Sequence, residues 1–283
     1  MTNLIRADLY RILRGKGIYI TFTLAAVLSF IVTIVMYLLF SFSRQALEAP
    51  EVSAAMSDVG MVEIFLNFSG WDMVSMLFSS SSSMLYFLIP IVFFAAASQF
   101  DYGTIKNAVA RGVNRTNIYI SAMILTGIFV LALFLVYILS GLAFVAMIIG
   151  LDDPPMENVL GTLFSVFGFQ FLILLAASFV GVFFAFLFRR GVSAVIALVV
   201  FYLVTNFAFG IIGNVFPDFR WLLNFEMGTA LNRIGSIGVT PSNIMSELAM
   251  TNADYIMVLC AVVFYSVVST VIGLILFRKA EIK

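Results

Sequence analysis

The sequence predicts an all-α membrane protein with six transmembrane helices. Apolar residues make up 63% of the 283 residues and charged residues only 11%, and the mean hydropathy is +1.12. Soluble domains contain about 45–50% apolar and about 25% charged residues, so this composition excludes a water-soluble fold. The chain also contains six long apolar runs, and none of them contains Asp, Glu, Lys or Arg.

Each run is long enough to cross about 30 Å of hydrocarbon, which takes about 20 residues in a helix. A β-barrel is excluded because its strands alternate in polarity, whereas these runs are apolar on all sides. The first run is too long for a signal peptide, so we expect a retained span. The predicted spans of this single transmembrane domain (1–283) are 17–43, 73–98, 118–150, 158–188, 192–216 and 255–277.

The segment before the first span, residues 1–16, predicts an amphipathic helix. The apolar residues share one arc at 100° per residue: Ile5, Leu9, Ile12 and Leu13. Asn3, Arg11 and Arg14 lie opposite. Such a helix would lie along the inner leaflet with its arginines near anionic headgroups. The alternative is a plain basic flank before a span.

The loops differ in charge, and this difference predicts the orientation. Twelve of the fifteen Lys and Arg residues fall on the side that carries both termini, and twelve of the fifteen acids fall on the other side. Cytoplasmic loops carry the excess of Lys and Arg, so both termini are predicted to be cytoplasmic. The outer loops are then 44–72, 151–157 and 217–254, and the inner loop is 99–117.

The outer loop 217–254 is predicted to lie at the membrane interface. It carries Phe219, Trp221 and Phe225, and aromatic residues prefer the headgroup layer. It also contains a possible helix start at Thr240-Pro241, with a cap residue followed by proline at the first helical position.

The inner loop predicts a short helix. Thr104 is a possible cap residue, and Gly112 can end the helix in the left-handed conformation that glycine tolerates. Ile105 and Val109 fall on an apolar face, and Lys106 and Arg111 on a polar one. A two-turn helix is marginal alone and needs a surface to rest on. The alternative is a solvated basic loop that only sets the topology.

The residues Gly103 to Asn107, followed by Arg111-Gly112-Val113 and Arg115-Thr116, lie directly between the second and third spans. This segment resembles the coupling region of bacterial type-2 ATP-binding cassette exporter permeases, and the order of elements along the whole chain is similar to theirs. The resemblance implies a loop that docks on a separate ATPase subunit, two ATPase copies and a second permease chain, identical or similar. It implies these coupling residues: Asp101, Gly103, Thr104, Ile105, Lys106, Val109, Arg111, Gly112 and Arg115. Asp101 stands near the place where such permeases often carry Glu.

The chain has no motif for catalysis of its own. It lacks a phosphate loop and a dinucleotide-binding glycine motif, and it contains no His and one Cys. We therefore expect no catalytic, cofactor or metal site in this chain, no nucleic-acid partner, and ATP with Mg²⁺ bound by the partner ATPase.

The second span contains a run of serines. Ser75, Ser79 and either Ser82 or Ser83 share a face at helical spacing, and they could line a transport path. The alternative is that their hydroxyl groups bond back to helix carbonyls. Pro90 is expected to kink the same helix.

The function predicted from these patterns is the permease subunit of an ATP-driven exporter. Uncharged spans rich in Phe, Leu, Met and Ser favour a hydrophobic or amphipathic cargo, such as a membrane-active or antimicrobial peptide, as in peptide and bacteriocin export or immunity. One alternative is an ATP-independent scaffold or sensor. Another, an ion-coupled carrier, is weakened by the absence of acids from the spans.

Overall fold

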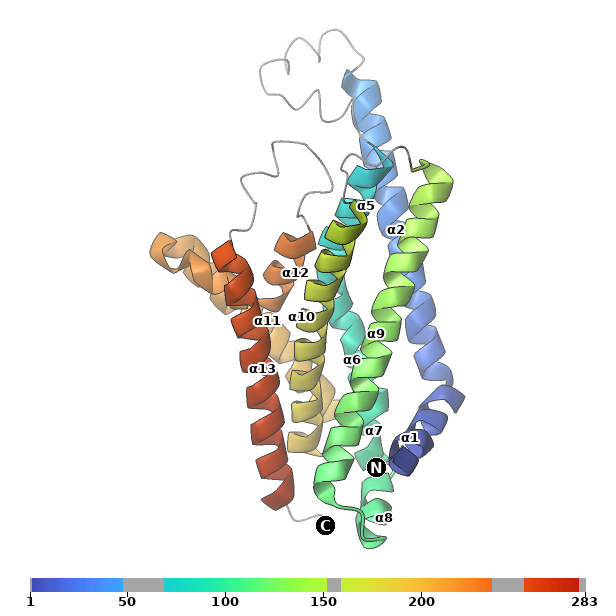
Figure 1. Cartoon of the computed structure of the whole chain (residues 1–283), viewed down its shortest axis with the longest axis vertical. Helices are drawn as coiled ribbons and strands as arrows, with labels where there is room; N and C mark the ends of the chain where they lie inside the picture. Colours follow the sequence, from blue (N-terminus) through green and yellow to red (C-terminus); the bar gives the residue numbers. More distant parts are fainter. Residues whose placement is uncertain (1, 48–68, 152–158, 236–251, 280–283) are drawn as a thin grey trace.

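The computed structural model describes residues 2–47, 69–151, 159–235 and 252–279, and within these ranges the chain is helical with no strand (Figure 1). Six of its helices are long and apolar enough to cross a membrane, as the sequence predicted. The chain is thus a multi-pass membrane protein. Most of the predicted outer loops 44–72 and 151–157 lies outside the described residues.

The six spans follow the order of the predicted runs. They are α2 (Lys16–Leu47), a broken second span from α5 (Gly70–Ser79) to α7 (Ser98–Asp101), α9 (Arg115–Ile148), α10 (Val159–Phe188), α11 (Gly191–Val215) and α13 (Asn252–Lys279). Helix α1 (Thr2–Arg14) precedes them. Since residues 2–14 are helical, the predicted N-terminal helix forms, and its position relative to a membrane stays a prediction.

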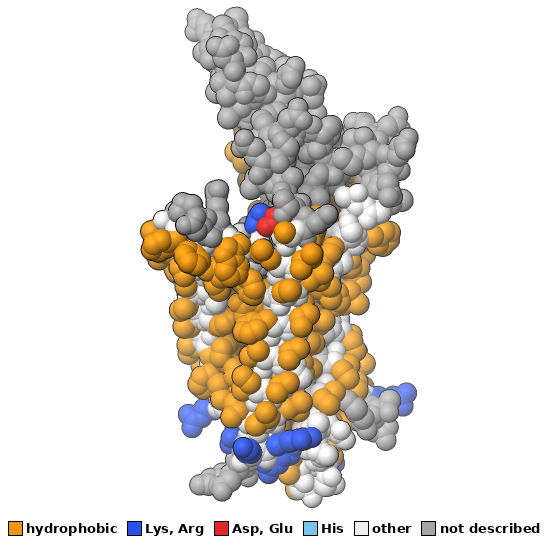
Figure 2. All heavy atoms as spheres, turned by 60° about the vertical axis from the view of Figure 1, so that its left-hand side comes forward, with side chains coloured by type: hydrophobic (Ala, Val, Ile, Leu, Met, Phe, Trp, Pro, Cys, Tyr) orange, Lys and Arg blue, Asp and Glu red, His pale blue; other side chains and the backbone are white. Residues whose placement is uncertain are grey.

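Helix α10 has the most central position, and it contacts α6, α9, α11, α12 and α13. Helices α2, α11 and α13 expose many large apolar side chains. Figure 2 shows a broad apolar belt on the face that it draws. Lys and Arg side chains gather below this belt, at the end that carries α1, α8 (Thr104–Ala110) and the last turn of α13. We call this end the basic end. An apolar belt with charges beyond its edges is the surface that a bilayer requires.

The α-helical second span is interrupted twice by other helix types. The serine run forms a 3₁₀ turn, η2 (Ser80–Ser83), between α5 and α6 (Met84–Val92). Pro90 lies inside α6, and a π-helical turn, η3 (Phe93–Ala97), follows it. Proline lacks the N–H that an α-helix needs, so irregular hydrogen bonding beside Pro90 has a local cause.

The segment predicted as an outer loop, 217–254, begins with ordered helical structure. A 3₁₀ segment, η4 (Pro217–Phe225), leads into helix α12 (Met227–Gly235). Helix α12 buries Met227, Ala230, Leu231 and Ile234 and contacts α5, η2 and α10. The prediction of an interfacial loop was therefore wrong for α12, which packs into the bundle because its apolar residues share one face. The predicted helix start at Thr240–Pro241 lies outside the described residues.

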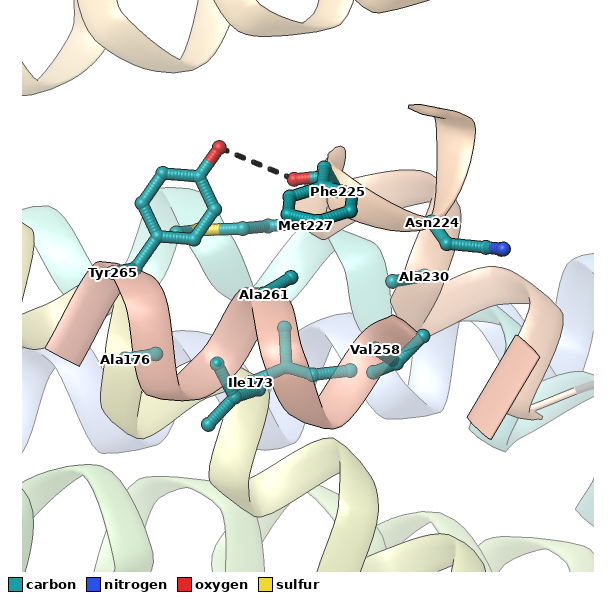
Figure 3. Close-up of a pocket in the computed structure, with 10 residues that line it drawn as sticks. Ile173, Ala176, Asn224, Phe225, Met227, Ala230, Val258, Ala261 and Tyr265 are labelled. Atoms are coloured by element: carbon teal, nitrogen blue, oxygen red, sulfur yellow. Dashed lines mark hydrogen bonds between the residues drawn. The ribbon is translucent and has the colours of Figure 1, made fainter. Parts of the chain in front are cut away.

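Figure 3 shows how this inserted segment meets the last span. Side chains from η4, α12, α10 and α13 surround a pocket of about 10 Å³. The hydroxyl group of Tyr265 on α13 donates to the carbonyl oxygen of Phe225 over 3.3 Å. A pocket of this size, with almost wholly apolar walls, is a small packing defect, and the Tyr265 hydrogen bond joins η4 to α13.

Two buried polar side chains satisfy carbonyl groups where the second span becomes 3₁₀. The amide nitrogen of Gln170 donates to the carbonyl oxygens of Phe78 at 2.9 Å and Leu231 at 3.0 Å. The Tyr137 hydroxyl group donates to the carbonyl oxygen of Leu77 at 3.2 Å. In lipid, each backbone carbonyl needs a partner within the protein, so these bonds make the break tolerable.

We predict that Gly235→Ala destabilises the bundle. A Cβ atom at Gly235 would overlap the backbone of Phe78 and Ser79, which cannot move like a flexible side chain. The expected cost is about 1–3 kcal/mol, as for other overpacked core positions. Thermal unfolding of the purified chain in detergent measures it, as a fall of several degrees in apparent Tm.

Gly210→Ala is the matched control, because a Cβ atom there meets nothing within 4 Å. It should leave the apparent Tm unchanged or raise it slightly, since alanine favours a helix over glycine by up to about 1 kcal/mol. Equal Tm values for both variants would show that α12 does not pack closely against the second span.

Candidate functional site

The candidate site lies at the basic end, where the second span turns into α8. After α7 ends at Asp101, Gly103 adopts a left-handed conformation with φ of 66° and starts a new helix direction. Thr104 is the first residue of α8 rather than its cap. Its hydroxyl group donates to the carbonyl oxygen of Gln99 at 3.0 Å. The predicted capping role of Thr104 was wrong, and the side chain instead joins α8 to the end of the second span.

The carboxyl end of α8 closes as the sequence predicted. Gly112 has φ of 81°. Its N–H donates to the carbonyl oxygen of Val109 at 2.9 Å, and the N–H of Val113 donates to that of Ala108 at 3.1 Å. These two bonds define a Schellman motif, in which the glycine takes a conformation that other residues adopt only with strain. Asn114 then caps α9 by accepting from the Thr116 N–H at 3.0 Å.

The apolar face of α8 packs against the protein itself. Ile105 is 2% exposed, and Ala108 and Val109 are half-buried against the same cluster. The cluster contains residues from five spans: Ala96, Ala97, Ile118, Tyr119, Ala122, Met123, Val182, Ala185, Phe186, Ala194 and Phe277. Ile105 therefore anchors α8 to the bundle and is not available for contact with a partner.

Four aromatic rings form the centre of this cluster. The Phe186 ring lies edge-on to those of Tyr119 at 4.8 Å, Phe277 at 4.8 Å and Phe100 at 5.1 Å, measured between centroids. The Tyr119 hydroxyl group also donates to the carbonyl oxygen of Ser269 in α13 at 2.9 Å. Edge-to-face aromatic pairs add about 0.5–1.5 kcal/mol each beyond burial, so α8 rests on a rigid support.

The opposite face of α8 is exposed and polar. Lys106, Asn107 and Arg111 are exposed, and Tyr102 beside them is 74% exposed. No ion pair of Lys106 or Arg111 occurs within the described ranges. The structure thus separates the predicted coupling residues into an anchored apolar set and an exposed basic set.

Two predicted coupling residues hold other helices in place. The Asp101 carboxylate accepts from the N–H of Gly191 at 3.1 Å, at the start of α11. Arg115 donates to the carbonyl oxygen of Arg278 at 3.1 Å, and Arg278 donates to Thr116 at 3.0 Å. Asp101 joins the second span to the fifth, and Arg115 joins the third to the sixth.

Helix α1 reaches the same end of the second span. Gln99 donates to the carboxylate of Asp8 at 3.4 Å, and Arg11 forms an ion pair with Asp8 at 3.6 Å. Burial raises the pKa of Asp8, and the charge of Arg11 offsets part of this rise. The guanidinium nitrogens of Arg11 are buried, whereas Leu13 is exposed. The predicted division of α1 into an apolar and a basic face was therefore wrong at these two positions.

The serine run follows the alternative interpretation at most positions. Ser79 and Ser80 donate to the carbonyl oxygen of Met76 at 2.9 and 2.8 Å, and Ser83 donates to that of Ser80 at 2.8 Å. Ser75 is buried. Ser82 lines a cavity of about 140 Å³. A path-lining role for Ser75, Ser79, Ser82 and Ser83 stays a prediction.

That cavity contains an acid that the sequence analysis missed. Glu226 is 4% exposed, and its carboxylate accepts from the N–H groups of Gly228, at 2.9 Å, and Thr229. The other lining residues are Leu85, Tyr86, Tyr202, Asn206 and Asn232. The six apolar runs predicted as spans contain no acid, but Glu226, directly before α12, enters the bundle with that helix. The helical spacing of apolar residues after Glu226 was the signal that could have located it.

No protein-family model matches the chain, and no curated protein matches its sequence.

We predict that Asp101→Ala destabilises the basic end while Asp101→Asn does not. Alanine removes the acceptor at the start of α11, which typically costs about 0.5–2 kcal/mol, and asparagine keeps an oxygen in the same place. Hydrogen exchange of the Gly191 amide, followed by mass spectrometry in detergent, should speed up in the alanine variant. Equal exchange in both variants would contradict the capping role.

Proposed function

We propose that the chain is the permease subunit of an ATP-driven exporter of the type-2 ATP-binding cassette kind. One observation supports this most strongly: α8 joins the cluster shared by five of the six spans through Ile105, and it presents Lys106 and Arg111 outward. A force on the exposed face of such a helix moves several spans together.

In this proposal a separate ATPase binds ATP and Mg²⁺ and docks on α8. Lys106 and Arg111 place the ATPase through charge, and the anchored apolar face transmits its movement. The bundle then changes between inward and outward access, as a two-state element biased by a ligand does. Two ATPase copies and a second permease chain, identical or similar, complete the assembly.

The basic end faces the cytoplasm of a bacterial cell in this proposal. The excess of Lys and Arg at that end supports this orientation, and α8 is then on the side where ATP is available. Both termini are cytoplasmic as a result, and α1 lies at the inner leaflet.

The proposed cargo is a hydrophobic or amphipathic compound, with a membrane-active peptide as the leading class. The six apolar runs carry no charge, so the walls that they form suit an apolar or amphipathic cargo better than a small ion.

The main alternative is an ATP-independent scaffold or sensor, in which the exposed face of α8 would have no ATPase to bind. The ion-coupled carrier gains support from Glu226, since such a carrier needs a buried acid. A stoichiometric ATPase that co-purifies with the chain separates the exporter from both alternatives.

We predict that reversing two charges on α8 uncouples the chain from its ATPase. Lys106→Glu with Arg111→Glu should reduce recovery of the ATPase with the tagged chain, in membranes of the source cell, by at least about tenfold. Each reversal replaces an attractive contact by a repulsive one worth of the order of 1 kcal/mol near a surface. Quantitative mass spectrometry of the pull-down measures it, together with the ATPase activity recovered.

Lys16→Glu with Lys279→Glu is the control, because both residues are exposed at the same end but lie outside α8. It changes the net charge equally and should leave recovery unchanged. If the control and the α8 variant lose the ATPase alike, or if the unaltered chain recovers none, the docking role of α8 is wrong.

We predict that the basic end is protected from an impermeant thiol reagent in intact cells. Cys260 is exposed on α13, so it is first replaced by Ala. Gln45→Cys, at the far end of α2, should then react, whereas Asn107→Cys on α8 should react only after the cells are opened. Reaction of Asn107→Cys in intact cells would reverse the orientation.

A further inference from the structure

We propose that the cavity at Glu226 binds the ammonium group of an amphipathic cation, whose apolar body lies in the groove between α2 and α6. The inference rests on the proposed export function for its biological role, since it would narrow the cargo class to cations. The binding itself follows from a buried charge, a cavity and a groove that adjoin one another.

The first step is the charge of Glu226. Its carboxylate is 4% exposed, and among the described residues no Lys or Arg forms an ion pair with it. Its hydrogen bonds to Gly228 and Thr229 use the positive end of α12, which offsets only about half a charge. Buried charges are costly unless they are paired, so a cation from outside the chain has a favourable place beside this carboxylate.

The second step is the space in front of the carboxylate. The cavity of about 140 Å³ lies between the second span, α11 and α12. Neutral polar groups of Ser82, Asn206 and Asn232 line it, and the Tyr86 side chain is 58% exposed beside them. Oxygen atoms around a carboxylate suit an ammonium group, which donates three hydrogen bonds. The volume suits a head group rather than a whole ligand.

The third step is the adjoining groove. A depression of about 450 Å³ runs between α2 and α6, and its walls are almost wholly apolar. Tyr86 lines both the cavity and the groove. The other groove residues are Gly17, Ile20, Thr21, Leu24, Phe87, Pro90 and Phe94. A single molecule can therefore place a charged head in the cavity and an apolar body in the groove.

The charges at the two ends of the cavity and groove favour one orientation of the ligand. The groove ends near Gly17, and the neighbouring Lys16 lines an adjacent depression at the basic end. A cationic head is repelled there and attracted at Glu226. The head of the ligand therefore lies at the Glu226 end, and its apolar tail points toward the basic end.

Photolabelling of the whole chain in phosphatidylcholine nanodiscs tests this inference. The probe is a long-chain primary amine with a diazirine in its alkyl chain, and the comparison probe is the alcohol of the same length. We expect amine adducts on the peptides that contain Tyr86 and Leu24, and about tenfold fewer in Glu226→Gln. The alcohol should label both chains equally.

Two further variants separate binding from folding. Glu226→Gln keeps one of the two oxygens that accept from Gly228 and Thr229 at the start of α12, so its Tm is measured beside its labelling. Asp72→Asn makes the same carboxylate-to-amide change at the cap of α5, away from the cavity. Asp72→Asn should label like the unaltered chain. Leu24→Trp, at an exposed groove position, should reduce labelling by both probes without changing Tm.

Several outcomes would overturn the inference. Equal amine labelling of the unaltered chain and Glu226→Gln would remove the role of the carboxylate, and equal labelling by amine and alcohol would remove charge selection. Suppression by sodium ions, but not by choline at equal concentration, would assign the cavity to an inorganic cation. No ATPase is present in the nanodiscs. A negative photolabelling result therefore does not affect the proposed docking of an ATPase on α8, and a negative pull-down result does not affect the proposed binding at Glu226.

Discussion

The carboxamide of Gln170 satisfies the constraint on which the bundle depends. Lipid offers no hydrogen bonds, so an irregular turn in a spanning helix survives only where the protein supplies partners. Gln170 supplies them to Phe78 beside the serine turn and to Leu231 in α12. One side chain of the central helix α10 therefore links the second span beside its 3₁₀ turn to the inserted helix α12, and Tyr137 adds a second bond at the turn. The cavity at Glu226 exists because α12 is held there.

The number and order of the spans could be predicted from the sequence, because each uncharged run of sufficient length is stable in lipid as a spanning helix. The stop of α8 at Gly112 could also be predicted, since a left-handed residue after a short helix favours glycine. Both predictions rest on local chemistry. The bounds of the 3₁₀ and π-helical turns could not be found in this way, because they depend on which side chains of other spans face them.

The candidate site was predictable only in part, for the same reason. The polarity of α8 separated Lys106 and Arg111 from Ile105, but periodicity does not say whether an apolar face meets a partner or its own chain. Asp101 has a role at α11 that depends on a contact ninety residues away in the sequence. Glu226 was missed because hydropathy over a long window treats a short inserted helix as part of a loop.

The 3₁₀ turn of the second span has a mechanical consequence. A 3₁₀ helix rises about 2.0 Å per residue and turns by about 120°, against about 1.5 Å and 100° in an α-helix. Conversion of Ser80–Ser83 to α-helix would shorten the span by about 2 Å and rotate one half against the other by about 80°. A change of helix type at this turn would therefore shift and rotate the part of the second span that packs against α12 relative to the part that ends at α8.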